Sequence, residues 1–468
     1  MKQYKMQIIK ALTFLGIFVF LLLGVTEILR TKQRDYLLQP FYSYEKGAFD
    51  VVFVGSSRTY TAVLPMELWK NFRITSFNMG MSAQTIPFSY YMVKDAIELQ
   101  EPELIVLDVG TVDLDALYEY ELMHGTIDNM KNLSSKLQLI YDLIPAGDRG
   151  RYLFPLTVYH DRWDSLSKSD FVKEKTYYYG ANPRSGKHSY GEIALTKTEE
   201  VKELPEINEI YLRKIISACQ EAEVELLLVA LPCFPVEGET DQQPYFNKVA
   251  EIAKEENVSF VNLIHHLDEL NFNMSSDMND NIHFNSLGAY KITEWYGNYI
   301  KDNNIIPYEY VEEAERWDED YQRWLTYMLP KTNVMKTYLD KIDNENYVIG
   351  IVAGNEMKQI PESILKSLEQ LGLSSNLFEL GNSYLAVIEN GVVTYEANEK
   401  ECQYCFGESE VLLKNNKNDQ SITVNGEELL RQDKNGLGII VIDSSLNEIV
   451  DAVLFDIDGK RIPYRIAK

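Results

Sequence analysis

A serine-containing turn that follows a short apolar strand is the first feature of this sequence that could do chemistry. Asp50 to Val54 reads DVVFV, which predicts a buried strand, and GSSRT follows directly as Gly55 to Thr59. The glycine permits a tight turn from strand to helix, so that a serine hydroxyl can stand clear of the sheet. Because a serine hydroxyl is a weak nucleophile, such a site needs a general base elsewhere in the chain.

A candidate base lies far along the chain, in the segment DNIHFNSLGAYK. Asp280 and His283 stand three residues apart there, just before a helix that we expect to begin near Ser286. One short turn can bring the carboxylate to one ring nitrogen of the imidazole and so fix the tautomer, while the other ring nitrogen accepts the serine proton. The chain therefore supplies a nucleophile, an acid and a base in the order Ser, Asp, His.

Several apolar strands that alternate with helical patterns must position these residues. After the first strand come Leu104 to Val109, Glu225 to Leu231 and Val258 to Leu263, and helical segments include Pro87 to Leu99 and Glu206 to Glu223. Near-continuous apolarity is typical of strands covered on both faces of a parallel sheet. The alternation predicts a doubly wound α/β domain over about 46–302, with reactive groups at the carboxyl ends of its strands.

These motifs together resemble the SGNH hydrolase superfamily, also called GDSL-like. The resemblance assigns Ser57 as the nucleophile, with Ser56 where the family has an aspartate, and matches Asp280 and His283 to the late D-x-x-H of the family. It implies a fold of SGNH (flavodoxin-like) type and a serine-dependent acyltransferase or esterase.

The oxyanion hole that the resemblance implies is incomplete in this sequence. FNMGMS matches the second family block, so the amides of Ser57 and Gly80 are the expected donors, with Asn78 as a supporting residue. The family pattern Gly-x-Asn-Asp is replaced by Gly110 to Asp113, in which valine stands where the asparagine would donate. Arg58 beside the nucleophile and Asp113 after the third strand are further candidates for the pocket, although an ion pair at the helix start explains Arg58 equally well.

A long apolar segment near the N-terminus predicts a membrane anchor. Ile8 to Leu29 has 22 residues, with charges only near its ends, and a helix of that length spans about 33 Å. A cleaved signal peptide is the alternative, but the segment is longer than a usual signal core and no A-x-A-like site follows it. Positive charges on its two sides nearly balance, so they do not fix the orientation.

The anchor and the variant GSS turn narrow the resemblance. Together with FNMG followed by a long helix, they are similar to membrane-anchored SGNH proteins such as the D-alanine transfer protein of teichoic acid modification and the alginate O-acetylation proteins. That resemblance implies a membrane-bound O-acyltransferase as partner, a glycan acceptor, and an extracytoplasmic catalytic domain. The region 346–468, with YVIGIVAGNE and NSYLAVIENG, resembles the interleukin-like EMT inducer domain.

Pattern changes along the chain predict further divisions. We expect a cytoplasmic tail over 1–7, the anchor over 8–29, a cap inserted into the catalytic domain at about 114–198, a helical connector over 303–345 and a C-terminal α+β domain over 346–468. The connector carries Trp317, Tyr321, Trp324 and Leu325 at spacings that could form one apolar stripe.

Charge and cysteine content limit the partners and cofactors. A net charge of −26 repels polyanions and so disfavours a nucleic-acid partner. Cys402 and Cys405 form a lone C-x-x-C without histidines at zinc spacing, so we expect neither a metal nor another cofactor, and either a local disulfide or free thiols there.

The sequence therefore predicts a membrane-anchored SGNH-type O-acyltransferase that modifies a cell-surface polysaccharide or another cell-envelope glycan through a Ser-linked acyl intermediate. An extracytoplasmic carbohydrate esterase would use the same residues with water as the acceptor. A non-catalytic glycan-binding or assembly protein is the third alternative.

Overall fold

The computed structural model describes residues 2–32, 34–114, 120–171, 178–186, 198–233, 241–306, 313–353, 360–374, 383–406, 409–416, 419–432, 436–457 and 464–465. The chain forms two compact units. The first comprises residues 1–183, 188–284 and 288–312, and the second comprises residues 184–187, 285–287 and 313–468.

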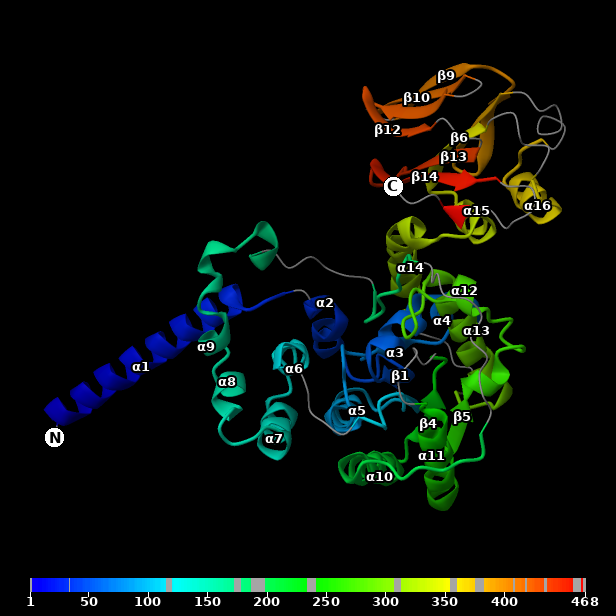
Figure 1. Cartoon of the computed structure of the whole chain (residues 1–468). Coiled ribbons are helices and arrows are strands. Elements are labelled where there is room, and N and C mark those ends of the chain that lie inside the picture. Colours follow the sequence, from blue (N-terminus) through cyan, green and yellow to red (C-terminus); the bar gives the residue numbers. More distant parts are fainter. Residues whose placement is uncertain are drawn as a thin grey trace. The chain divides into compact units, whose positions relative to one another are not determined.

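A five-stranded parallel sheet forms the centre of the first unit (Figure 1). Its strand order is β2-β1-β3-β4-β5, which confirms the predicted doubly wound α/β fold. The strands are β1 (Val51–Val54), β2 (Ser76–Asn78), β3 (Leu104–Asp108), β4 (Glu225–Ala230) and β5 (Ser259–Asn262). The sequence analysis did not predict β2.

Helices cover both faces of this sheet. Every residue of β1 and β3 is buried, which requires cover on both sides because successive side chains point to opposite faces. Val51 and Phe53 pack with Ile292 and Tyr296, which lie on α13. The principal helices of this unit are α3 (Ser57–Ala62), α4 (Pro65–Phe72), α5 (Ile86–Gln100), α10 (Glu206–Glu221), α11 (Gln243–Glu256), α12 (Met274–Asp277) and α13 (Ser286–Asp302).

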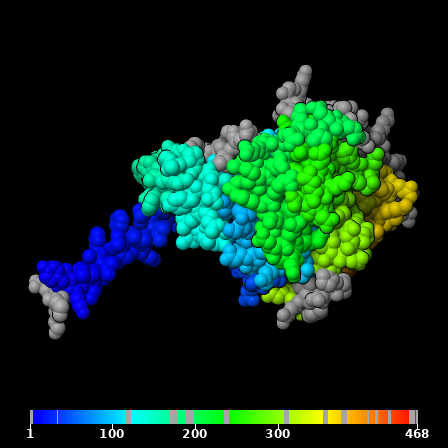
Figure 2. Space-filling view, turned by 90° about the horizontal axis from the view of Figure 1, so that it is seen from below, coloured from blue at the N-terminus to red at the C-terminus, as the bar shows by residue number. Residues whose placement is uncertain are grey.

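The N-terminal helix α1 (Lys2–Leu29) is long and apolar enough to cross a membrane. An 18-residue stretch within Tyr4–Leu29 has a mean hydropathy of 2.5, and the apolar side chains of α1 are exposed along the helix (Figure 2). Length and composition fit either a membrane anchor or a signal sequence. No other helix among the described residues passes the same test.

The described part of the predicted cap is helical. It contains α6 (Tyr120–Ile127), α7 (Leu133–Leu143), α8 (Arg149–Leu153), α9 (Leu156–Tyr159) and the 3-10 turns η2 (Arg162–Asp164) and η3 (Lys168–Asp170). The short helices α2 (Asp35–Leu38) and η1 (Gln39–Ser43) lead from α1 to the sheet. α7 packs on α5 and α9 packs on α1, so this segment connects the central domain to the N-terminal helix.

The described residues of the second unit form two antiparallel sheets and three α-helices. The helices are α14 (Ala314–Met328), α15 (Met335–Ile342) and α16 (Glu362–Gln370). One sheet has the order β15-β14-β13-β6-β7-β8 and the other the order β12-β11-β10-β9. The strands are β6 (Tyr347–Ala353), β7 (Tyr384–Glu389), β8 (Val392–Ala397), β9 (Glu401–Phe406), β10 (Ser409–Asn416), β11 (Asp419–Val424), β12 (Glu427–Gln432), β13 (Gly436–Asp443), β14 (Glu448–Asp456) and β15 (Tyr464–Arg465).

Apolar side chains pack on both faces of the larger sheet in the second unit. Val348 and Val387 of the larger sheet pack against Val411 and Ile422 of the smaller one, which makes a sandwich core. The other face of the larger sheet packs on α15 and α16. The apolar stripe predicted from Trp317, Tyr321, Trp324 and Leu325 is buried on α14.

Candidate active site

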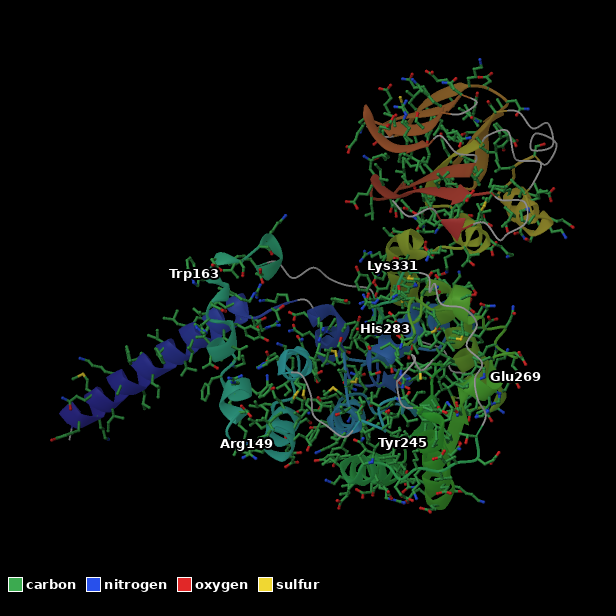
Figure 3. All side chains as sticks on the ribbon, viewed as in Figure 1. Arg149, Trp163, Tyr245, Glu269, His283 and Lys331 are labelled. Atoms are coloured by element: carbon green, nitrogen blue, oxygen red, sulfur yellow. The ribbon has the colours of Figure 1, made fainter. Side chains whose placement is uncertain are left out.

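Side chains from two distant parts of the sequence meet in the first unit. The Nε2 atom of His283 lies 2.8 Å from Oγ of Ser57, a residue 226 positions earlier. The Nδ1 atom of His283 lies 2.9 Å from Oδ2 and 3.1 Å from Oδ1 of Asp280. Figure 3 labels His283 in the centre of this unit. The structure therefore brings the predicted serine, histidine and aspartate into one hydrogen-bonded chain.

The turn after β1 holds Ser57 at the edge of the sheet. A Cβ atom on Gly55 would lie 2.2 Å from Oγ1 of Thr59 and 2.8 Å from Cβ of Asp108, so only glycine fits at this close approach. Ser56 caps α3 by accepting a hydrogen bond from the Arg58 amide at 3.3 Å. Ser57 is then the first helical residue, where the backbone N–H has no intrahelical acceptor. Ser57 is partly exposed, so its side chain is accessible.

A narrow loop between α12 and α13 carries the acid and the base. Met278 and Phe284 form an antiparallel bridge, and the Asn279 amide donates to the His283 carbonyl at 2.8 Å. The Phe284 amide donates to Oγ1 of Thr61 at 3.3 Å, which ties the loop to α3. The helix that carries the serine therefore also anchors the loop that carries the histidine.

Hydrogen bonds keep Asp280 ionised. Its carboxylate accepts from the amides of Ile282 and His283, at 3.0 and 2.8 Å, and from Nδ2 of Asn279 at 2.9 Å. Partial burial opposes ionisation, but the bonds from His283, Ile282 and Asn279 outweigh it and hold the pKa of Asp280 well below its usual range. Since this carboxylate can only accept, Nδ1 of His283 carries the proton and Nε2 of the neutral ring is free to accept one from Ser57.

Asn78 and Gly80, the expected oxyanion residues, form a turn packed on α3. Asn78 is fully buried, and its Nδ2 atom donates to the carbonyls of Thr59 and Val63 at 2.9 and 3.2 Å. The Gly80 amide donates to Oδ1 of Asn78 at 3.0 Å, which closes an Asx turn. A Cβ atom on Gly80 would lie 3.0 Å from the Ser56 carbonyl oxygen, so the glycine permits this packing.

The resemblance implies that the Gly80 amide is an oxyanion donor. The amide already has an acceptor, because the Asn78 side chain folds back onto it. Asn78 itself is part of the scaffold of the turn, since its amide group bonds to the backbone of α3. The assignment of the Gly80 and Ser57 amides as oxyanion donors stays a prediction.

Arg58 points into a buried polar cluster beside the serine. Its guanidinium lies 3.7 Å from the Asp108 carboxylate, and Nη1 donates to Oε1 of Gln242 at 3.3 Å. Burial opposes the charge, but the Cys233 thiol and the Asp108 carboxylate hold the pKa of Arg58 above its ordinary value. The guanidinium passes directly over Gly110, where a Cβ atom would lie 1.1 Å from Nη2.

Asp113 belongs to the same cluster through Gln242. Nε2 of Gln242 donates to Oδ1 of Asp113 at 2.7 Å and to the Gly110 carbonyl at 3.0 Å. Burial raises the pKa of Asp113, although the Gln242 bond partly offsets this effect. Among the described residues, the side chains of Arg58 and Asp113 contact Gln242 and Asp108, not the side chains of the triad.

Sequence reasoning missed three residues that support this region. Asp108 is the last residue of β3 and the one charged residue in LIVLDV. An isolated charge at the end of an apolar strand could have identified it as a candidate site residue. Thr61 and Gln242 carried no signal, because each acts through a partner more than a hundred positions away in the chain. Within the parts of the chain that the structure describes, no group of three or more His, Cys, Asp or Glu side chains could hold a metal ion.

Comparison with known proteins gives a likeness of structure alone. No family model and no curated protein matches the sequence. An acylhydrolase of Bacteroides fragilis matches with 11% identity and a TM-score of 0.29, over 54% of this chain and 86% of that one. A GDSL-like lipase of Bacteroides thetaiotaomicron matches with 13% identity and a TM-score of 0.28, over 57% and 93%.

A third similar structure is a lipolytic protein of the G-D-S-L family from Desulfitobacterium hafniense, with 13% identity, a TM-score of 0.26, and 53% and 97% coverage. Each of these likenesses spans slightly more than half of this chain. At such identities and TM-scores they carry no argument about activity, so the chemistry of the site rests on the geometry of Ser57, Asp280 and His283.

Proposed function

We propose that Ser57, His283 and Asp280 form the catalytic triad of a serine-dependent acyl-transfer enzyme. The single observation that carries this proposal is the 2.8 Å contact between Nε2 of His283 and Oγ of Ser57, with Asp280 bonded to the other ring nitrogen. A serine, a base and an orienting carboxylate at these distances form the arrangement that activates a hydroxyl as a nucleophile.

The mechanism is a double displacement. His283 takes the proton of Ser57 as Oγ attacks the carbonyl carbon of an acyl donor, and it returns that proton to the leaving group when the tetrahedral intermediate collapses. An acceptor hydroxyl then gives its proton to His283 and attacks the acyl-serine, and His283 returns that proton to Oγ as Ser57 leaves. We assign the amides of Ser57 and Gly80 to the oxyanion, the Gly80 amide turning from Asn78 as charge develops.

The proposed acceptor is a hydroxyl of a cell-envelope glycan. Two features support this choice: the long apolar helix α1, which suits a membrane anchor, and the resemblance of GSS, FNMG and D-x-x-H to membrane-anchored acylation proteins. In this proposal α1 stays in the membrane with the catalytic unit outside the cytoplasm. A membrane-bound O-acyltransferase supplies the acyl group.

An esterase is the second candidate. The His283 side chain is 21% exposed and that of Asp280 is 39% exposed, so water can approach the triad. Water in place of a sugar hydroxyl would complete the same two displacements with the same residues.

The identity of the acceptor separates these candidates. Full-length protein in detergent is incubated with p-nitrophenyl acetate, with and without a hexose oligosaccharide, and both p-nitrophenol and acetylated sugar are measured. Transferase activity predicts acetylated sugar, and an esterase predicts acetate and p-nitrophenol alone. Both activities should vanish in Ser57→Ala and persist in Ser217→Ala, a matched change at an exposed serine of α10. If Ser57→Ala behaves as wild type, the triad assignment is wrong.

A further inference from the structure

A cavity lies at the base of α1 and shares no residue with the triad. Its volume is about 360 Å³, which is within the range of small-molecule sites. It is lined by residues that follow α1 and by residues of the α6 and α9 region: Thr31, Arg34, Leu122, His124, Gly125, Asp128, Asn129, Val158, Tyr159 and Arg162.

Two arginines on its wall make the cavity suitable for an anion. Arg34 makes no side-chain hydrogen bond or ion pair within the described part of the chain, and its Nη1 lies 2.9 Å from where a Cβ atom of Gly125 would be. Arg162 is held in place, because it donates to the Leu29 carbonyl at 2.6 Å and to Asp170 at 3.1 Å. An arginine without a carboxylate partner can use its donor fork on a phosphate.

A buried histidine on the same wall has an unused ring nitrogen. Nδ1 of His124 lies 3.0 Å from Oδ2 of Asp128, which also accepts from Tyr159 at 2.8 Å. The ring stacks on Tyr152 with centroids 4.2 Å apart, so its orientation is fixed. Nε2 of His124 and Oδ1 of Asp128 are both buried without a partner in the described residues. Buried polar atoms are normally satisfied, so two unused ones beside a cavity indicate a polar occupant.

The position of the cavity points to a membrane lipid. Thr31 and Arg34 come two and five residues after the end of α1 at Leu29, so a membrane-inserted α1 places them at the level of the headgroups. Neighbouring turns expose large aromatic side chains: Phe154 is 61% exposed, Trp163 71% and Phe171 63%. Figure 3 shows Trp163 beside the carboxyl-terminal end of α1. Trp is enriched at membrane interfaces, and Phe is common on surfaces that lie against the acyl chains there.

We propose that this cavity binds the phosphate-bearing headgroup of an anionic membrane lipid. Arg34 binds the phosphate, Arg162 adds positive charge while it holds the cavity against α1, and His124 hydrogen bonds to the headgroup through Nε2. On Asp128, the acidic residue on the wall, His124 and Tyr159 occupy Oδ2, which leaves Oδ1 to accept a hydrogen bond from a headgroup hydroxyl. The inference rests on α1 staying in the membrane, as proposed above, and does not depend on the chemistry of Ser57.

Lipid binding by the full-length, delipidated protein in detergent tests this inference. Native mass spectrometry follows titration with phosphatidylglycerol, phosphatidylcholine or inorganic phosphate. Phosphatidylglycerol should bind in preference to phosphatidylcholine, and Arg34→Gln should weaken that binding by about tenfold or more because it removes a charge-assisted bond. Leu122→Trp, which fills the cavity without changing its charge, should have the same effect.

Controls separate this site from general electrostatics and from the proposed catalysis. Arg151→Gln makes the same charge change at an exposed position of α8 outside the cavity and should bind lipid as wild type does. Ser57→Ala should also bind lipid normally. Equal binding of both lipids, or unchanged binding in Arg34→Gln, would overturn the proposal. If inorganic phosphate binds as tightly as phosphatidylglycerol, the ligand is free phosphate and the assignment of a lipid is wrong.

Discussion

The Nε2 atom of His283 lies 2.8 Å from Oγ of Ser57, and the two residues are held in that position by one helix. Ser57 begins α3, and Thr61 on the same helix accepts the Phe284 amide from the loop that carries His283. Because the nucleophile and its base share this support, their separation is set by the scaffold before any substrate binds. Such preorganisation lets a proton move without rearrangement of the chain.

Removing either end of this contact should disable the site to the same extent. Ser57→Ala and His283→Ala should each lower kcat by about 10³-fold or more, and the double variant should be no worse than either one, because the pair acts as a unit. Steady-state hydrolysis of p-nitrophenyl acetate checks this. Additive losses in the double variant would show that the two residues act separately.

Asp280→Asn should keep the fold and lose the activity. The asparagine oxygen can still accept the loop amides, but its NH₂ group forces the wrong tautomer on His283, and kcat should fall by about 10⁴-fold. The low pKa of Asp280 means that its stabilising bonds are fully present above about pH 4 and weaken only as the pH falls through the lowered value. Activity of Asp280→Asn within about tenfold of wild type would contradict the argument that Asp280 sets the tautomer of His283.

Asp95 should make the stability of the first unit depend on pH. This carboxyl is fully buried on α5 and accepts from Tyr42 at 2.7 Å, and burial raises its pKa to about 6. The folded protein therefore holds the proton to higher pH than the unfolded chain. The contribution of Asp95 to stability should be greatest below about pH 4, fall by up to about 3 kcal/mol by about pH 6, and stay level above it.

The matched variants for this effect are Asp95→Asn and Asp164→Asn. Urea unfolding at a series of pH values should show no such decline in Asp95→Asn, whose side chain cannot ionise. Asp164 is exposed on η2, so its variant should keep the wild-type profile. Identical profiles for Asp95→Asn and wild type would refute the assignment.

Gly110→Ala should displace the Arg58 guanidinium without changing any charge. The new methyl group would lie 1.1 Å from Nη2, so the arginine must leave Asp108 and Gln242. An unpaired buried carboxylate is costly, and we expect a loss of about 3 kcal/mol in the free energy of unfolding. Gly147→Ala, where the methyl group meets nothing within 4 Å, should change it by less than about 0.5 kcal/mol. Equal stability of the two variants would contradict the close packing of Arg58.

Cys402 and Cys405 should remain free thiols with different reactivities. Both lie on β9 three positions apart, so their side chains point to opposite faces of the strand, and neither forms a disulfide in the structure. Cys405 is exposed, whereas burial raises the pKa of Cys402. Timed maleimide labelling with mass spectrometry should modify Cys405 first, and Cys405→Ser should remove the fast phase. An intact mass that shows an oxidised pair would exclude this arrangement.

Much of the first unit could be predicted from sequence, because its strands are continuous apolar runs. The predicted strands that start at Asp50, Leu104 and Glu225 agree with β1, β3 and β4 to within one residue at each end. β2 was missed since it has only three residues, of which Ser76 and Asn78 are polar, so neither length nor apolarity indicated a strand.

The local contacts of the site could be predicted from the sequence, whereas its long-range contacts could not. Asp280 and His283 lie within one turn, so their spacing alone indicates a contact. The Gly80 amide donates to Asn78 only if the asparagine side chain folds back onto the backbone. The residue types at these two positions do not determine that conformation. Gln242 reaches Arg58 because β1, β3 and β4 are successive strands in the sheet, a fact of topology rather than of local pattern.

The most direct test of the catalytic triad is an intact-mass measurement. The full-length protein is exposed briefly to p-nitrophenyl acetate, and the reaction is then quenched at low pH. The account predicts one acetyl group on wild type, located on Ser57 by peptide mapping and absent from Ser57→Ala and His283→Ala. An acetyl group that persists in Ser57→Ala, or wild-type turnover with no serine-linked intermediate detectable, would contradict it.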